Sequence, residues 1–254
     1  MPETPPSPID HLNAIMARLR DEEQGCPWDV AQTFQSIAPY TIEEAYEVAD
    51  AIARDDMASL KDELGDLLFQ VSFHARMAEE AGQFCFDDVA NAICDKMIRR
   101  HPHVFGDAEK PDWEALKAAE RAHAPDASAI GGVALGLPAL MRAEKIQKRA
   151  ARIGFDWPDS EGALAKVYEE IAEVEASTTV HDTEEEIGDL LFATVNWARK
   201  LGVDPEVALR SATEKFERRF RAMEAAPGPE FQTLSLDEME ALWQAVKINQ
   251  AARA

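Results

Sequence analysis

Pairs of acidic residues at helical spacing are the feature of this sequence best suited to chemistry. Glu44 and Glu47 lie three positions apart, and Glu63 and Asp66 repeat that spacing. Residues three or four apart project from one face of a helix, so each pair would present two carboxylates together. If the two helices pack antiparallel, the carboxylates converge. The second half of the chain repeats both pairs, with Glu170, Glu173, Glu186 and Asp189.

Converging carboxylates indicate a metal site. Like charges at close range disfavour ionisation and destabilise the fold, and a hard divalent cation with oxygen ligands removes that repulsion. Mg²⁺ suits the pattern best, because it accepts a few carboxylates and completes its shell with water and substrate phosphate. Mn²⁺ is a possible substitute. A single acidic pair is usually a solvated helix face, but these pairs border apolar residues and occur twice.

A basic block follows each acidic group. Lys96 and Arg100 lie four apart on an expected helix, as do Lys215 and Arg219. Cations opposite a metal-loaded acidic cluster suit a polyphosphate held between them. Lys215 and Arg219 would take up the charge that develops on a leaving pyrophosphate. Glu169, just before the first acid of the second half, could position or deprotonate the attacking water, which is a hypothesis.

The recurring blocks indicate an internal duplication. The two acidic blocks and the basic block recur in order, offset by 126, 123 and 119 residues. Apolar residues recur at helical spacing, and no strand-like alternation is evident. We therefore predict an all-α fold of two tandem, related helical-bundle units. The units span 1–110 and 138–254, joined by a connector over 111–137 that contains proline, glycine and alanine.

Capping signals mark several helix ends. Asp204 before Pro205 is typical of a helix start, and Ser235 with Glu238 matches a capping box. Glycines stand where helices could end, at Gly82, Gly154 and Gly202. The tryptophans are more often core residues than base-stacking platforms; they are Trp28, Trp113, Trp157, Trp197 and Trp243.

Composition limits the classes of partner. The chain has 254 residues, 48 acidic and 26 basic, for a net charge of −22. This balance argues against general binding to nucleic acid or to anionic membranes. It does not exclude an anionic substrate, because a bound divalent metal inverts the local field. Three cysteines without zinc-ligand spacing, no signal peptide and no apolar stretch of membrane-spanning length lead us to expect a cytoplasmic protein.

Other catalytic signatures are absent or incomplete. Glu120 and His123 have the spacing found in di-iron bundles, but such sites need the motif twice. The sequence contains no phosphate-binding GxxxxGK[ST] loop, GxSxG motif or Cys–His signature.

The motifs together resemble the MazG family of nucleoside triphosphate pyrophosphohydrolases, within the all-α NTP pyrophosphatase superfamily. The likeness covers almost the whole chain. Besides the acidic pairs, it includes GCPWD at 25–29, RRHPHVF at 99–105, KIQKR at 145–149, IGFDW at 153–157 and KFERRF at 215–220. The resemblance implies Mg²⁺-dependent conversion of an NTP and water to NMP and diphosphate, with broad base tolerance. It also implies a homodimer that clears aberrant or excess nucleotides.

The resemblance also assigns roles by position. The family's metal ligands fall on Glu170, Glu173, Glu186 and Asp189, and in the N-terminal unit on Glu44, Glu47, Glu63 and Asp66. Its nucleotide contacts fall on Lys166, Lys215, Arg219 and Trp243. Further candidate substrate contacts in the repeated blocks are Glu169, Glu170, Glu185, Asp189 and Arg218.

The two units are not equivalent. Aligning Glu170 on Glu44 places Lys166 opposite Tyr40, so the N-terminal unit lacks a cation one turn before its first acid. It also lacks an obvious counterpart of the helix that carries Trp243. We therefore expect the C-terminal unit to be the main active site.

Three other functions stay open at this stage. The main alternative is a non-catalytic, dimeric nucleotide- or metal-binding regulatory protein. A pyrophosphohydrolase restricted to one substrate, such as dUTP or a phosphoribosyl-nucleotide, and an acidic scaffold without metal are the others. The intact acids and their basic partners favour the enzyme.

Overall fold

The computed structural model describes residues 6–106, 126, 128–226 and 230–251 of the chain. These residues form α-helices and one short 3₁₀ helix, with no β-strand among them. Within those ranges, no helix combines the length and apolarity needed to cross a membrane. The chain divides into two compact units, Met1–Ala118 and Ala119–Ala254. The predicted all-α fold of two tandem helical units is confirmed.

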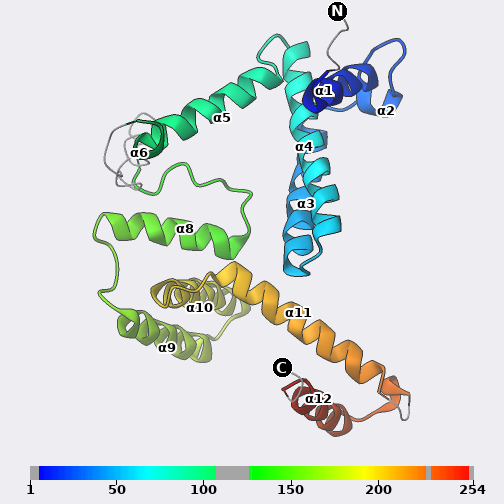
Figure 1. Cartoon of the computed structure of the whole chain (residues 1–254). Coiled ribbons are helices and arrows are strands. Elements are labelled where there is room, and N and C mark those ends of the chain that lie inside the picture. The colour runs from blue at the N-terminus through cyan, green and yellow to red at the C-terminus, as the bar shows by residue number, and fades with distance from the viewer. Residues whose placement is uncertain (1–5, 107–125, 127, 227–229, 252–254) are drawn as a thin grey trace, which may run out of the picture. The chain divides into compact units, whose positions relative to one another are not determined.

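The first unit is built around a helical hairpin. Its helices are α1 (Pro8–Leu19), α2 (Pro27–Val30), α3 (Phe34–Ala53), α4 (Met57–Glu80), α5 (Phe86–Arg100) and α6 (Pro102–Phe105). The α3 and α4 helices pack side by side along their length (Figure 1). Asp55 in the connecting turn has a φ of 54°, a conformation that aspartate tolerates better than most residues. The buried core joins α1, α3 and α4 through Met16, Ile37, Phe73 and Met77.

The second unit repeats the hairpin and extends it. Its elements are α8 (Ala139–Arg152), α9 (Ser160–Ala176), α10 (Val180–Lys200), α11 (Pro205–Glu224), the 3₁₀ helix η1 (Phe231–Thr233) and α12 (Leu236–Ala251). The α9 and α10 helices form the second hairpin, and α8 packs on α10 (Figure 1). The α11 helix contacts α8 near the hairpin and α12 toward its other end. The hairpins of both units therefore carry the acidic pairs.

The capping predictions are confirmed. The Asp204 side chain accepts a hydrogen bond from the Val207 N–H, and Pro205 opens α11. At the start of α12, the Ser235 N–H donates to Glu238 Oε2 at 2.8 Å. The three predicted stop glycines all adopt positive φ, which favours glycine: +66° at Gly82, +89° at Gly154 and +73° at Gly202.

The assignment of the tryptophans to the core is wrong for two of them. Trp28 is 51% exposed and Trp157 is 44% exposed, because each lies in or beside a loop. Trp197 and Trp243 are half-buried. Trp113 lies outside the described residues, as do Glu120 and His123 and most of the predicted connector 111–137, so the connector's bounds stay a prediction.

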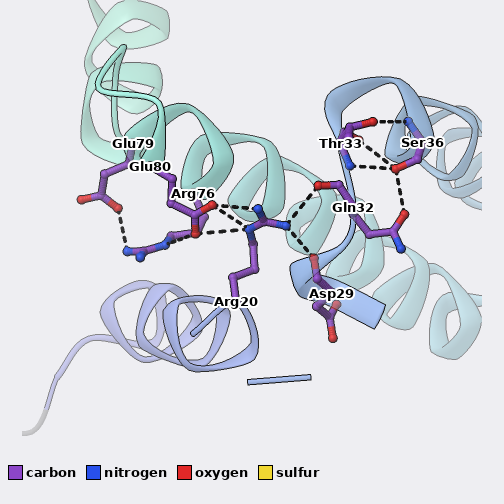
Figure 2. A network of polar contacts seen from close by, with 8 residues as sticks. All are labelled: Arg20, Asp29, Gln32, Thr33, Ser36, Arg76, Glu79 and Glu80. Carbon is purple, nitrogen blue, oxygen red and sulfur yellow. Dashed lines mark hydrogen bonds and ion pairs between the residues drawn. The ribbon is translucent and has the colours of Figure 1, made fainter. Parts of the chain in front are cut away.

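An arginine network fastens the loop before α3 to the rest of the first unit (Figure 2). Arg20 follows α1, and its Nη2 donates to Glu80 Oε2 of α4 at 2.7 Å. Its Nη1 donates to the carbonyl oxygen of Asp29, and its guanidinium carbon lies 5.4 Å from the Phe73 ring centroid. The Arg20 side chain is only 9% exposed. One buried cation thus links a helix end, a loop and the core.

The same loop requires glycine at position 25. A Cβ atom on Gly25 would lie 2.4 Å from the backbone oxygens of Leu19 and Asp21, which is closer than real Cβ atoms approach. The next residue, Cys26, donates its backbone N–H to the Leu19 carbonyl at 2.8 Å. This turn explains the glycine in the GCPWD motif, and the Arg20 contact with Asp29 holds the motif's other end.

The network predicts a pH-dependent contribution to stability from Glu80. Partial burial raises the pKa of Glu80, but hydrogen bonds from Arg20 and Arg76 outweigh it and hold the pKa below its usual value of 4.5. A lowered folded-state pKa means that the stabilisation is present above the unfolded-state pKa and is lost as pH falls through the folded-state value. We expect Glu80→Gln to reduce the unfolding free energy by about 1 kcal/mol at pH 7. The difference from wild type should shrink below about pH 4, as urea titrations at several pH values would show. A difference that is constant with pH would contradict this assignment.

Candidate active site

The C-terminal hairpin brings three of the predicted acids together. Carboxylate oxygens of Glu170, Glu186 and Asp189 all lie within 4.8 Å of one another, a spacing at which they could hold a metal ion. Glu170 comes from α9, and the other two come from adjacent turns of α10. Glu170 is 5% exposed in its side chain, and its Oε2 has no hydrogen-bond partner. A buried, unpartnered carboxylate oxygen is costly unless a cation balances it, so this donor set fits a hard metal.

Glu173, the fourth predicted ligand, lies beside this group but not within its 4.8 Å limit. A hydrogen bond with Glu170, partial burial and the charges of Glu170 and Glu186 raise the pKa of Glu173, against an opposing effect of Lys166. The raised pKa shows that Glu173 shares the field of the cluster. Its role as a fourth ligand stays a prediction.

Among the described residues, Lys166 is the cation that pairs with these acids. Its Nζ lies 2.6 Å from Glu169 Oε1 and 2.7 Å from Glu170 Oε1. Its distance to Glu173 Oε2 is 3.9 Å. Hydrogen bonds that Lys166 donates to Glu169 and then to Glu170 raise the pKa of Lys166, so the ammonium stays charged. The i, i+3 and i+4 spacing of these residues on α9 is the sequence signal for the contact.

The N-terminal hairpin builds a similar acidic group. Carboxylate oxygens of Glu44, Glu63 and Asp66 lie within 4.8 Å of one another. The pKa of Glu44 is raised by burial, and then by the charges of Asp66 and Glu47. The pKa of Glu63 is raised by burial, and then by Glu47 and Asp66. Both pKa values are raised, first by burial and then by neighbouring acids of like charge, and no cation is among the causes.

Tyr40 stands where Lys166 stands in the second unit. It lies one turn before Glu44 on α3, is 40% exposed, and packs edge-on against Trp28 with ring centroids 6.0 Å apart. Among the described residues, no ion pair reaches Glu44, Glu63 or Asp66. The two acidic groups therefore differ in their surroundings: a lysine pairs with the second group, and a tyrosine holds the corresponding position in the first unit.

Two of the predicted nucleotide contacts, Arg219 of α11 and Trp243 of α12, lie against each other. The Arg219 guanidinium carbon lies 5.6 Å from the Trp243 ring centroid, and its Nε donates to Gln250 Oε1 at 3.1 Å. Lys215 and Arg218 are exposed on α11. In the part of the chain that is described, no ion pair joins these three cations to the acids of α9 and α10. Their expected place across a gap from the acids stays a prediction.

Three polar residues at or near the two sites differ in how the sequence signals them. Glu169 is 59% exposed and bonded to Lys166, as helical spacing allows, and Glu185 is exposed on α10. Gln250 accepts a hydrogen bond from Arg219 across 31 residues of sequence. No motif marks Gln250, so sequence reasoning misses it.

Comparison with known proteins agrees with this architecture. A model of the MazG nucleotide pyrophosphohydrolase domain matches residues 32–105 and 160–223. The chain is 56% identical over 254 residues to the nucleoside triphosphate pyrophosphohydrolase of Escherichia coli K12, covering 94% of this chain and 97% of that protein. It is 44% identical over 245 residues to the nucleoside triphosphate pyrophosphohydrolase/pyrophosphatase MazG of Thermotoga maritima, covering 94% and 95%. It is 43% identical over 250 residues to the uncharacterized protein YabN of Bacillus subtilis, covering 93% and 51%.

The two matched ranges coincide with the duplicated helices. The first contains α3, α4 and α5, and the second contains α9, α10 and nearly all of α11. The family match thus occurs twice, once on each acidic hairpin. The resemblance inferred from the motifs is confirmed, and the chain belongs to the MazG family.

Proposed function

We propose that this chain hydrolyses nucleoside triphosphates to monophosphates and diphosphate at the acids of α9 and α10, with Mg²⁺ bound there. The observation that carries the proposal is the buried, unpartnered Oε2 of Glu170, which lies in a group of three carboxylates within 4.8 Å. Two relatives that match the chain over most of its length are named for this activity.

Different residues of the chain have different proposed roles in the hydrolysis. Glu170, Glu186 and Asp189 would hold Mg²⁺, with Glu173 beside them. When bound, Mg²⁺ polarises phosphate oxygens and neutralises their charge. Water attacks phosphorus, the bridging P–O bond breaks, and diphosphate leaves. Lys215 and Arg219 neutralise charge on that leaving group.

We propose that Arg219 and Trp243 bind a phosphate and the base of the nucleotide. Their contact on α11 and α12 combines a cation with an aromatic face, which suits a phosphate beside a base. Arg218 on α11 and Glu185 on α10 remain candidate substrate contacts. Broad base tolerance, the clearing of aberrant nucleotides and a cytoplasmic location also stay predictions.

Product analysis with a panel of NTPs and dNTPs tests the function. We expect NMP and diphosphate in equal amounts, and no reaction after metal is removed with EDTA. Release of orthophosphate with NDP would contradict the proposal. A chain that gains thermal stability with Mg²⁺ but shows no turnover with any nucleotide would favour the non-catalytic regulatory protein.

Glu169 is the proposed base for the attacking water. It is exposed and is held by Lys166 next to the acidic group, so it can accept a proton without binding the metal. We expect Glu169→Gln to lower kcat by about 100-fold or more, because general bases contribute factors of that size. Mg²⁺ affinity, measured by calorimetry in the presence of the α,β-methylene analogue of ATP, should stay near that of the wild type.

An exposed glutamate on the same helix provides the matched control. Glu175→Gln on α9 removes one negative charge at an exposed position outside the cluster and should leave kcat unchanged. Loss of Mg²⁺ binding in Glu169→Gln would show that Glu169 is a ligand instead of a base.

We also propose that the protein is a homodimer. On the C-terminal hairpin, apolar residues near the acids are exposed, with Ile187 at 41% and Leu191 at 54%. The repeat-related residues of the first unit, Leu64 at 49% and Leu68 at 37%, are exposed as well. Exposed apolar residues one helical turn apart, repeated on both hairpins, favour coverage by a partner. Sedimentation velocity should give twice the chain mass, and a monomer at micromolar concentration would contradict the proposal.

A further inference from the structure

Lys166 contacts Glu170, the buried acid of the proposed metal site. Its ammonium lies 2.7 Å from Oε1 of Glu170, whose carboxylate also belongs to the group that could hold a metal ion. The same ammonium reaches Glu169 at 2.6 Å and Glu173 at 3.9 Å. One side chain thus balances a row of acids along one face of α9. An ammonium bonded to Glu170 weakens the binding of a divalent ion to the same carboxylate, because the two cations repel each other.

The ion pair between Lys166 and Glu170 can be broken by movement of the lysine side chain. Lysine carries its charge on a flexible stem with three rotatable donors, so it can exchange one set of oxygens for another. The Lys166 side chain is 36% exposed, whereas that of Glu170 is 5% exposed. The buried carboxylate is fixed and needs a counter-charge, while the lysine can turn toward solvent. A triphosphate arriving beside the cluster offers the ammonium several phosphate oxygens for charge-assisted hydrogen bonds.

The first unit provides the natural comparison. Tyr40 occupies the position of Lys166, and no ion pair among the described residues reaches Glu44, Glu63 or Asp66. A phenol brings no positive charge to this group. The two acidic groups have the same spacing and differ in whether a cation is already bonded to the first acid.

We propose that Lys166 is a displaceable counter-ion that makes Mg²⁺ binding at the C-terminal site depend on the triphosphate. The triphosphate draws the ammonium away from Glu170, so metal and nucleotide bind together at this site. The N-terminal group lacks this control and takes Mg²⁺ without nucleotide. The identity of the anion rests on the proposed function, whereas the difference between the two sites rests on the contacts of Lys166.

Calorimetric titration of Mg²⁺ into the full-length chain tests the inference. Without nucleotide, we expect one site per wild-type chain in the accessible affinity range, and two per chain in Lys166→Met. The C-terminal site should bind Mg²⁺ about tenfold or more tightly in that variant, because a positive charge next to a ligand has been removed. Adding the α,β-methylene analogue of ATP, which cannot release diphosphate, should bring the second site into range in the wild type.

Two further variants make the result specific. Tyr40→Lys should weaken the N-terminal site, because it places an ammonium one turn before Glu44. Lys148→Met removes a comparable helical ion pair, 2.6 Å from Glu144 on α8, and should leave Mg²⁺ binding unchanged. Circular dichroism melting would check that each variant is folded.

The outcomes separate this inference from the proposed function. Two equal Mg²⁺ sites in the nucleotide-free wild type, or unchanged binding in Lys166→Met, would overturn the role of Lys166. So would a wild-type chain in which the analogue brings no second Mg²⁺ site into range. None of these measurements depends on turnover, so an absence of diphosphate release would count against the enzyme alone.

Discussion

Replacing Glu170 by alanine is expected to lower diphosphate release about a thousandfold. The carboxylate is buried, joins two acids of α10, and has one oxygen without a partner, so its loss should empty the proposed metal site. A metal ion supplies several kcal/mol of charge stabilisation in a transition state, and about 4 kcal/mol corresponds to a thousandfold change in rate. Continuous detection of diphosphate at saturating Mg²⁺ would measure the effect.

Glu44→Ala is the matched variant in the first unit. It removes the corresponding acid from a group with the same 4.8 Å geometry, and we expect it to leave kcat within about threefold of wild type. Repeat-related Glu173→Ala and Glu47→Ala extend the comparison to the second acid of each pair. If the first-unit variants abolish release while the second-unit variants do not, the ranking of the two units is wrong.

The expected difference follows from what surrounds equal acids. Lys166 pairs with the C-terminal group, whereas Tyr40, which packs on Trp28, holds the corresponding position in the first unit. The C-terminal unit also carries α12, where Trp243 meets Arg219. Metal ligands alone hold a cation, but hydrolysis of a triphosphate also needs groups that bind its phosphates and base. The duplication thus preserves the acids and the basic block in both units, whereas Lys166 and Trp243 occur in the second unit alone.

The acidic groups could be predicted because their geometry is local. Residues three apart on a helix must share a face, and the short turns at 54–56 and 177–179 make hairpins that bring the faces together. Recurrence of the pairs distinguished them from ordinary surface charge. Helix ends at Gly82 and Asp204 were predictable for the same reason, since capping depends on a few neighbouring residues.

Long-range contacts could not be predicted in this way. Arg20 and Glu80 are 60 residues apart, and Arg219 and Gln250 are 31 apart. Each pair depends on how separate helices pack, which spacing along one helix does not report. The apolar stripe of α4 shows the same limit: Leu64 and Leu68 have helical spacing but are exposed, and Phe73 and Met77 form the core instead.

Replacing Arg20 by methionine is expected to destabilise the first unit by about 3 kcal/mol. Methionine keeps much of the apolar contact with Phe73 but removes one of the two partners of Glu80 and the donor to the Asp29 carbonyl. Breaking a buried ion pair from one side costs roughly 3 to 5 kcal/mol, and the lower end applies because Glu80 is 29% exposed. For a unit of this size, the melting temperature should fall by about 10 °C or more.

A second arginine on the same glutamate provides the control. Arg76 also bonds to Glu80, at 2.8 Å, but its side chain is 30% exposed, and its hydrogen bonds to described residues go to Glu79 and Glu80 of its own helix. Arg76→Met should therefore cost about 1 kcal/mol or less. Hydrogen exchange of the amides around Gly25 and Asp29 should quicken in Arg20→Met and stay near wild type in Arg76→Met. Equal destabilisation by both variants would show that the ion pair with Glu80, and not the anchoring of the GCPWD loop, accounts for the stability contributed by Arg20.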